Sequence, residues 1–161
     1  MDTPLRLRNR NRNRAHAQRG AYAVEFAMVF LISFSLLYGV ITYGMLFAFR
    51  MGLQNAAEDG ARAALRYQPT IAKRADQAKA TATSSSSWMP SKVAPDVEAT
   101  VCEVLTNNCA NPACTTWDTR CQMIVTVTAN NLQQLLPPFP SFAMPDQIVG
   151  KANMLLDGRV P

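Results

Sequence analysis

The reactive or charged side chains of this sequence are few, and one of them stands inside an apolar run. Glu25 is the only charged residue between Gly20 and Arg50. On insertion scales, a carboxylate at the centre of a membrane helix costs about 2.5–3.5 kcal/mol, and less near an interface. A plain anchor would be better served by leucine at this position. The glutamate, together with the glycine just before the run, therefore indicates a processing and assembly signal.

The residues alone leave two interpretations of Glu25 open. It is either a polar residue tolerated near a membrane interface, where Arg19 can pair with it, or the partner of a newly made amine. A cut after Gly20 would leave a free α-amino group on Ala21, one helical turn from Glu25. In a low-dielectric setting the attraction between such an amine and the carboxylate is strong.

Four cysteines follow the apolar run with the spacing C-x6-C-x4-C-x6-C. This spacing lacks the close CxxC pairs of a zinc site. An even number of cysteines in an exported segment predicts two disulfides rather than free thiols or a metal site. If strands near residues 96–105 and 121–130 pair antiparallel, we expect nested bridges, Cys102–Cys121 and Cys109–Cys114, among the three pairings that four cysteines permit.

No catalytic constellation is visible in the sequence. His16 is the only histidine and lies in the N-terminal tail, which excludes a Ser-His-Asp or Cys-His arrangement in the exported part. There is no glycine-rich phosphate loop and no histidine-based metal cluster. We therefore expect no catalytic residues, no metal, no cofactor and no enzymatic activity.

The net charge of +5 is confined to the first 20 residues, which hold six arginines and one aspartate. Residues 21–161 hold ten basic and ten acidic side chains. A nucleic-acid interface needs a basic patch on a folded surface with stacking aromatics, so we expect no direct nucleic-acid partner. A basic tail ahead of an apolar run is instead what the positive-inside rule requires of a cytoplasmic flank.

The apolar run is long enough to cross a lipid bilayer. Phe26 to Phe49 are 24 uncharged residues. As a helix they extend about 36 Å, and a hydrocarbon core is about 30 Å thick. The run exceeds the 7–15 residues of an ordinary secretory signal. We expect a single-pass protein whose N-terminus is cytoplasmic and whose chain after Arg50 lies outside.

The pattern predicts an α+β fold, a long N-terminal transmembrane helix followed by a small antiparallel-sheet domain with disulfides. Pro69 is the first proline after the apolar run and ends the helix near Tyr67. A second helix is expected from Ile71 to about Thr83, and strands over 97–101, 124–128 and 148–156. We expect residues 1–20 to form a cytoplasmic basic leader that is disordered over 1–19, and residues 21–67 to form the long helix, which spans the membrane to about residue 49. Residues 68–90 should hold the second helix and a serine-rich linker. Residues 91–161 should form the exported, disulfide-bonded, β-rich domain.

Small residues recur every four positions along the long helix. They are Gly44, Ala48, Gly52, Ala56, Gly60 and Ala64. Such a stripe lets another backbone approach closely, as in small-xxx-small packing between helices. We expect it to pack against another subunit. A groove for the chain's own C-terminal domain, or a helix that is simply rich in alanine, are the alternatives.

The stretch from Arg19 to Tyr67 resembles the N-terminal signature of TadE-like proteins, minor pilin-like components of the tight-adherence (Tad/Flp) pilus. The AVEFA core, the apolar run and the QNAAEDGARAA segment carry the resemblance. It implies a pilin-like helix that a prepilin peptidase cuts between Gly20 and Ala21, with Glu25 at the fifth mature position. Phe26 stands where the major pilins of this group usually carry tyrosine, which fits a minor subunit.

The resemblance also implies a function and partners. The chain would be a minor subunit that initiates, caps or anchors a Tad-type pilus, located in the inner membrane with its C-terminal domain in the periplasm, or at the cell surface within a pilus. Its partners would be the prepilin peptidase, other minor pilins, the major pilin, the inner-membrane assembly platform and the lipid bilayer. The alternative is an uncleaved single-span anchor with an exported partner-binding domain.

Overall fold

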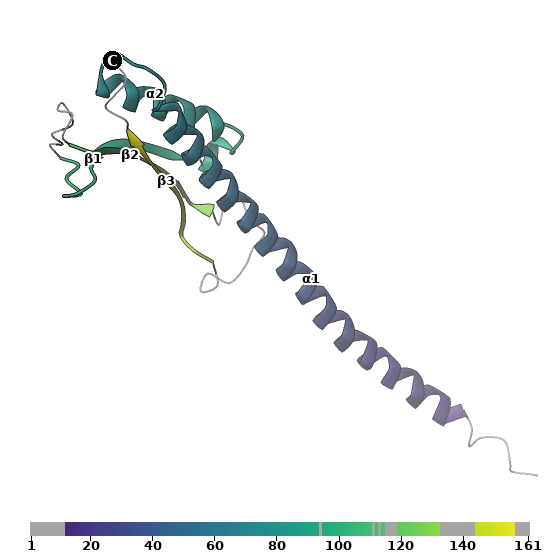
Figure 1. Ribbon diagram of the computed structural model, residues 1–161. Coiled ribbons are helices and arrows are strands. Elements are labelled where there is room, and N and C mark those ends of the chain that lie inside the picture. Colours follow the sequence, from purple (N-terminus) through teal and green to yellow (C-terminus); the bar gives the residue numbers. More distant parts are fainter. Residues whose placement is uncertain are drawn as a thin grey trace, which may run out of the picture. The chain divides into compact units, whose positions relative to one another are not determined.

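The computed structural model describes residues 12–93, 95–110, 112, 114, 119–132 and 144–156. In chain order its elements are α1 (Arg12–Ala63), α2 (Ile71–Ser85), the short 3-10 helix η1 (Ser91–Val93), β1 (Asp96–Glu103), β2 (Cys121–Asn130) and β3 (Gln147–Leu156) (Figure 1). The strands form one antiparallel sheet in the order β1-β2-β3. The predicted α+β fold, a long N-terminal helix followed by a small antiparallel sheet with two disulfides, is confirmed.

The chain forms two compact units, residues 1–43 and residues 44–161. The helix α1 contributes its N-terminal part to the first unit and its C-terminal part to the second. Besides this part of α1, the second unit holds α2, η1 and the sheet, and these elements after α1 are together called the domain below.

Both ends of α1 differ from the expectation. The helix has 52 residues and begins at Arg12, so residues 12–19, expected to be disordered, are helical. Arginine, alanine and glutamine are good helix formers, and extending an existing helix needs no new nucleation. At the other end α1 stops at Ala63 rather than near Tyr67. Directly after Ala63 the Leu65 N–H donates to the Arg62 carbonyl, so the chain turns more tightly than an α-helix does. Residues 1–11 lie outside the described part of the chain.

The second helix has a cap at each end that its sequence provides. The Thr70 hydroxyl accepts a hydrogen bond from the Lys73 N–H at 3.2 Å, which satisfies one free donor of the first turn. At the C-terminus the buried Ser86 donates through its hydroxyl to the Ala82 carbonyl at 2.8 Å. The serine tract thus ends α2 two residues beyond the expected Thr83.

One face of the sheet forms the core of the domain. Along β2 every second side chain is buried, and the register sets Val127 opposite Val97 and Met123 opposite Val101. Small side chains from α1 and α2 cover this face, which allows the helices to lie close to the strands. The main core residues are Leu53, Ala57, Ala61, Ala78, Ala82, Val97, Met123, Val125 and Val127.

The disulfides are sequential, so the nested pairing was wrong. Cys102 bonds to Cys109, and Cys114 bonds to Cys121. The register sets Cys102 opposite Gln122 and Cys121 opposite Glu103, an offset of one residue. Since side chains alternate between the two faces of a strand, Cys102 and Cys121 point to opposite faces and cannot be bridged. Each bridge instead closes a local loop at one side of the β1–β2 connection.

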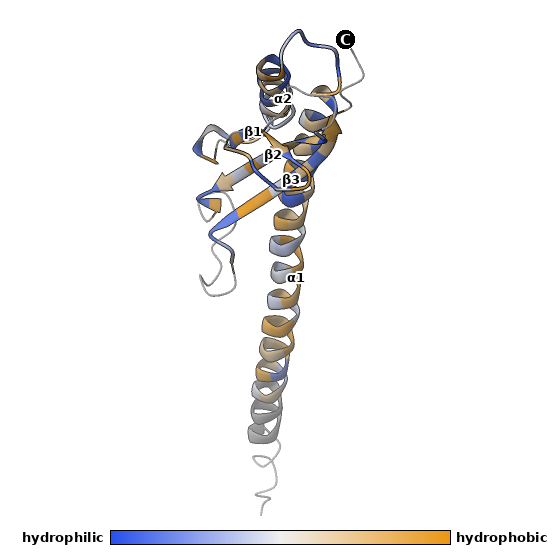
Figure 2. Cartoon of the chain, turned by 60° about the vertical axis from the view of Figure 1, so that its left-hand side comes forward, coloured by the Kyte–Doolittle hydropathy of each residue, from blue (hydrophilic) through white to orange (hydrophobic). Residues whose placement is uncertain are grey.

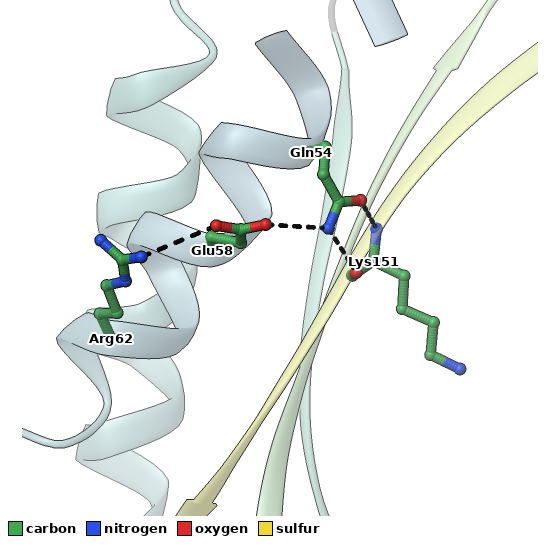
Figure 3. A network of polar contacts seen from close by, with 4 residues as sticks. All are labelled: Gln54, Glu58, Arg62 and Lys151. Atoms are coloured by element: carbon green, nitrogen blue, oxygen red, sulfur yellow. Dashed lines mark hydrogen bonds and ion pairs between the residues drawn. The ribbon is translucent and has the colours of Figure 1, made fainter. Parts of the chain in front are cut away.

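The outer edge of β3 is covered by α1. The side-chain amide of Gln54 donates to the Lys151 carbonyl at 3.0 Å, and its oxygen accepts the Lys151 N–H at 3.1 Å (Figure 3). This pair of bonds substitutes for the neighbouring strand that an edge lacks, and covering an edge protects it from unwanted pairing. Glu58 accepts a third bond from Gln54 at 3.2 Å and lies 3.8 Å from the Arg62 guanidinium.

Candidate processing and assembly site

The residues expected to be processed lie on an open part of α1. Gly20 and Ala21 are consecutive helical residues, and both are exposed. A Cβ placed on Gly20 would meet no atom within 4 Å. Nothing in the described chain therefore packs against this peptide bond or requires a glycine beside it.

Glu25 follows Ala21 by four residues on the same helix and is exposed. Residues four apart are neighbours on a helix surface, about 5–6 Å between their Cβ atoms. The structure thus sets the carboxylate one turn from the position where cleavage would create an amine. A negative charge in the first turn or two of a new helix N-terminus is also favoured by the helix dipole.

A row of aromatic rings begins at Phe26, directly after the glutamate. Successive ring centroids are 6.0 Å apart for Phe26 and Phe30, 5.9 Å for Phe30 and Phe34, and 6.3 Å for Phe34 and Tyr38. Sequence reasoning selected Phe26 because it stands where the major pilins of the resembled group usually carry tyrosine, and it missed the row. The signal was present, because the four aromatic residues recur at the i, i+4 spacing that gathers side chains on one helix face.

The helix that carries these residues is long and apolar enough to anchor the chain in a membrane. The most apolar 18 residues of the stretch Gly20–Ala63 have a mean hydropathy of 2.1, and none of those 18 residues is buried within the protein. Figure 2 shows hydrophobic residues along α1. The one buried hydroxyl in this stretch, Thr42, donates to the Tyr38 carbonyl at 2.9 Å, so it brings no unsatisfied polar group into an apolar setting.

The small-residue stripe divides into two parts. The C-terminal four residues of the stripe face the chain's own domain; they are Gly52, Ala56, Gly60 and Ala64. A Cβ on Gly60 would lie 2.8 Å from the Ala78 carbonyl oxygen, and the Trp88 ring fills the space beside Gly52. Gly44 and Ala48 are exposed, and a Cβ on Gly44 would meet nothing within 4 Å. Packing against another subunit therefore stays a prediction for Gly44 and Ala48 alone.

The described residues hold no group of three or more histidine, cysteine or acidic side chains that could bind a metal ion. All four cysteines are in disulfides. The arrangement leaves the Gly20–Ala21 peptide bond and the Glu25 carboxylate accessible to another protein.

Taken together, the described residues form an α+β protein with one helix that is long and apolar enough to cross a membrane. The model of the family described as TadE-like protein matches residues 20–62, which confirms the resemblance over that stretch and points to an association with the Tad pilus. The match ends within α1, so α2 and the sheet lie beyond it. No curated protein and no solved structure matches the chain.

Proposed function

We propose that this chain is a minor pilin-like subunit of a Tad-type pilus, cut by a prepilin peptidase between Gly20 and Ala21. It initiates, caps or anchors the fibre together with other minor pilins, the major pilin and the inner-membrane assembly platform. The basic leader stays in the cytoplasm, as the positive-inside rule requires. The domain lies in the periplasm, where two disulfides are stable.

The observation that carries this proposal is an exposed glycine directly before Ala21 and five residues before Glu25. Glycine in a helix interior costs about 0.8–1.0 kcal/mol relative to alanine. No neighbouring atom needs the space, since a Cβ there would meet nothing within 4 Å. A peptidase gives the glycine a purpose, because a residue without a Cβ lets the helix open locally and lets an active site approach the backbone.

Glu25 then acts after the cut. The new α-amino group of Ala21 is largely protonated near neutral pH. The Glu25 carboxylate can neutralise this amine in its own helix or in a neighbouring subunit, and the exposure of both residues leaves either route open. In apolar surroundings the pair is worth far more than in water, so assembly gains a charge pair that the precursor lacks.

The test is the mature N-terminus, read by mass spectrometry on protein from membranes and from sheared surface fractions. We expect Ala21 as the first residue, and an uncut precursor that still inserts for Gly20→Val. Gly39→Val is the matched control, because Gly39 also lies in α1 with nothing within 4 Å of its Cβ position. An intact Met1 in the wild-type chain would refute the proposal in favour of the uncleaved anchor.

A further inference from the structure

The domain contacts α1 where the apolar run ends. The Trp88 ring stacks on Phe49 with centroids 5.6 Å apart and planes 6° from parallel. The same ring fills the space at Gly52, so the indole lies against the turn of α1 between these two residues. Trp88 is nevertheless 50% exposed, although it is one of the largest apolar side chains in the domain.

A second part of the domain flanks the same turn of α1. Leu46 and Arg50 line a groove together with Ile148 and Val149 at the start of β3. Leu46 and Phe49 also pack against the core of the domain. Val149 is 41% exposed. Two separate segments, the turn after α2 and the start of β3, thus place apolar surface beside residues 46–52.

The length of the apolar run fixes the level of this surface relative to a bilayer. A hydrocarbon core of about 30 Å takes about 20 helical residues, so a span that starts at Phe26 leaves the core between about residues 45 and 49. The headgroup region adds about 5–7 Å on each side, equivalent to a further three to five residues. The turn of α1 from Phe49 to Gly52 therefore falls within the headgroup region.

We propose that Phe49, Arg50, Trp88 and Val149 form an interfacial face, by which the domain rests in the phospholipid headgroup region of the outer side of the membrane. This inference rests on the membrane-spanning part of the proposed function. Tryptophan favours the membrane–water interface because its ring is apolar and its N–H needs a polar partner. Arg50, the first charge after the run, can extend to lipid phosphates while its stem stays in the apolar zone.

A lipid occupant fits this face better than a protein does. The face is continuous with the apolar helix surface before it, where Met45 and Phe47 are exposed. An exposed indole and an exposed cation at the same level of α1 match a headgroup layer, whose carbonyl and phosphate oxygens accept hydrogen bonds from both. The domain is thereby held at the membrane surface until the subunit leaves the bilayer.

The test uses the depth of Trp88 in vesicles. The full-length Trp117→Phe chain, in which Trp88 is the only tryptophan, is reconstituted into phosphatidylcholine–phosphatidylglycerol vesicles that contain brominated lipids with the label at a shallow or a deep acyl position. We expect Trp88 emission to be quenched strongly by the shallow label and weakly by the deep one. If Trp117→Phe does not fold, the same signal is obtained as the wild-type emission minus that of Trp88→Phe.

The control places the reporter at the other end of the domain. Tyr67 is 60% exposed and follows α1, whose last residue is about 21 Å further along the helix than Phe49. A single tryptophan at this position, made by Tyr67→Trp in a chain with Trp88→Phe and Trp117→Phe, should escape both labels.

Two failures are distinguishable in this design. If sodium carbonate extracts the wild-type chain from membranes, the membrane span itself is refuted, and the proposed function with it. If the chain resists carbonate but Trp88 is quenched no more than the Tyr67→Trp control, only the interfacial face is refuted, and its exposed surface serves a protein partner instead.

Discussion

Replacing Gly150 with alanine should weaken the packing of β3 against α1. The α1 backbone passes directly over this glycine: a Cβ at position 150 would lie 2.5 Å from the Leu53 carbonyl carbon and oxygen and 2.7 Å from the Gln54 nitrogen. These are backbone atoms of a helix, which cannot rotate away as a side chain would. The strand must therefore move away from α1 by about 1 Å to reach ordinary contact, where dispersion attraction is optimal near 3.5–4.0 Å.

The free energy of unfolding should fall by several kcal/mol. Overpacking a well-filled core costs about 1–3 kcal/mol. A shift of about 1 Å also stretches both hydrogen bonds between Gln54 and the Lys151 backbone, which now measure 3.0 and 3.1 Å. Each such bond contributes about 0.5–1.5 kcal/mol. Together the loss is about 2–6 kcal/mol, against a total stability of about 5–15 kcal/mol for a typical domain.

The measurement is thermal unfolding of the full chain in detergent, followed by tryptophan fluorescence under non-reducing conditions. For a domain of this size each kcal/mol lowers Tm by about 4–8 °C, so we expect a fall of at least about 8 °C. Gly44→Ala is the matched control, since its Cβ meets nothing within 4 Å and alanine is the better helix former. A Gly150→Ala chain as stable as the wild type would refute the close approach of β3 to α1.

Three further predictions follow from other parts of the chain. The Glu25→Ala chain should still insert and be cut before Ala21, but it should give few or no pili in sheared fractions, because the partner of the new amine is lost. Wild-type pilus levels in this variant would show that Glu25 is only a polar residue tolerated near the interface. Cys102→Ser and Cys109→Ser should each lower the stability of the domain by about 2–3 kcal/mol or more for so short a loop, since both remove the same bridge. Non-reducing peptide mapping that recovers a Cys102–Cys121 peptide instead would contradict this pairing. Thr70→Ala should cost about 0.5–2 kcal/mol by removing the N-cap of α2, measurable by the same thermal unfolding, and Thr70→Ser should restore most of the loss.

The elements of this fold were predictable where local chemistry decides them. Pro69 and Thr70 mark the start of α2 because one disfavours a helix before it and the other caps the helix after it. The β-branched run Ile124–Thr128 indicates a strand, and it lies within β2.

The contacts between elements were less predictable, because they depend on the register of the strands and on which element packs against each face of the sheet. A one-residue offset in the β1–β2 pairing sends Cys102 and Cys121 to opposite faces, and no spacing between cysteines reveals that offset. Likewise, a lone glycine in a strand signals a bulge or a close approach without saying to what. Only the structure shows that Gly150 faces the α1 backbone.

The sequential disulfides have a mechanical consequence. Each bridge joins residues seven apart, and neither links the sheet to a helix. If a load pulls on the sheet while α1 is held, no disulfide resists their separation beyond the connecting backbone, and the contacts that do are non-covalent, chiefly the apolar core and the Gln54–Lys151 pair. Once these give way, each disulfide withholds roughly 20–25 Å of chain from extension. Under force the sheet would therefore separate from α1 before either disulfide-closed loop is extended.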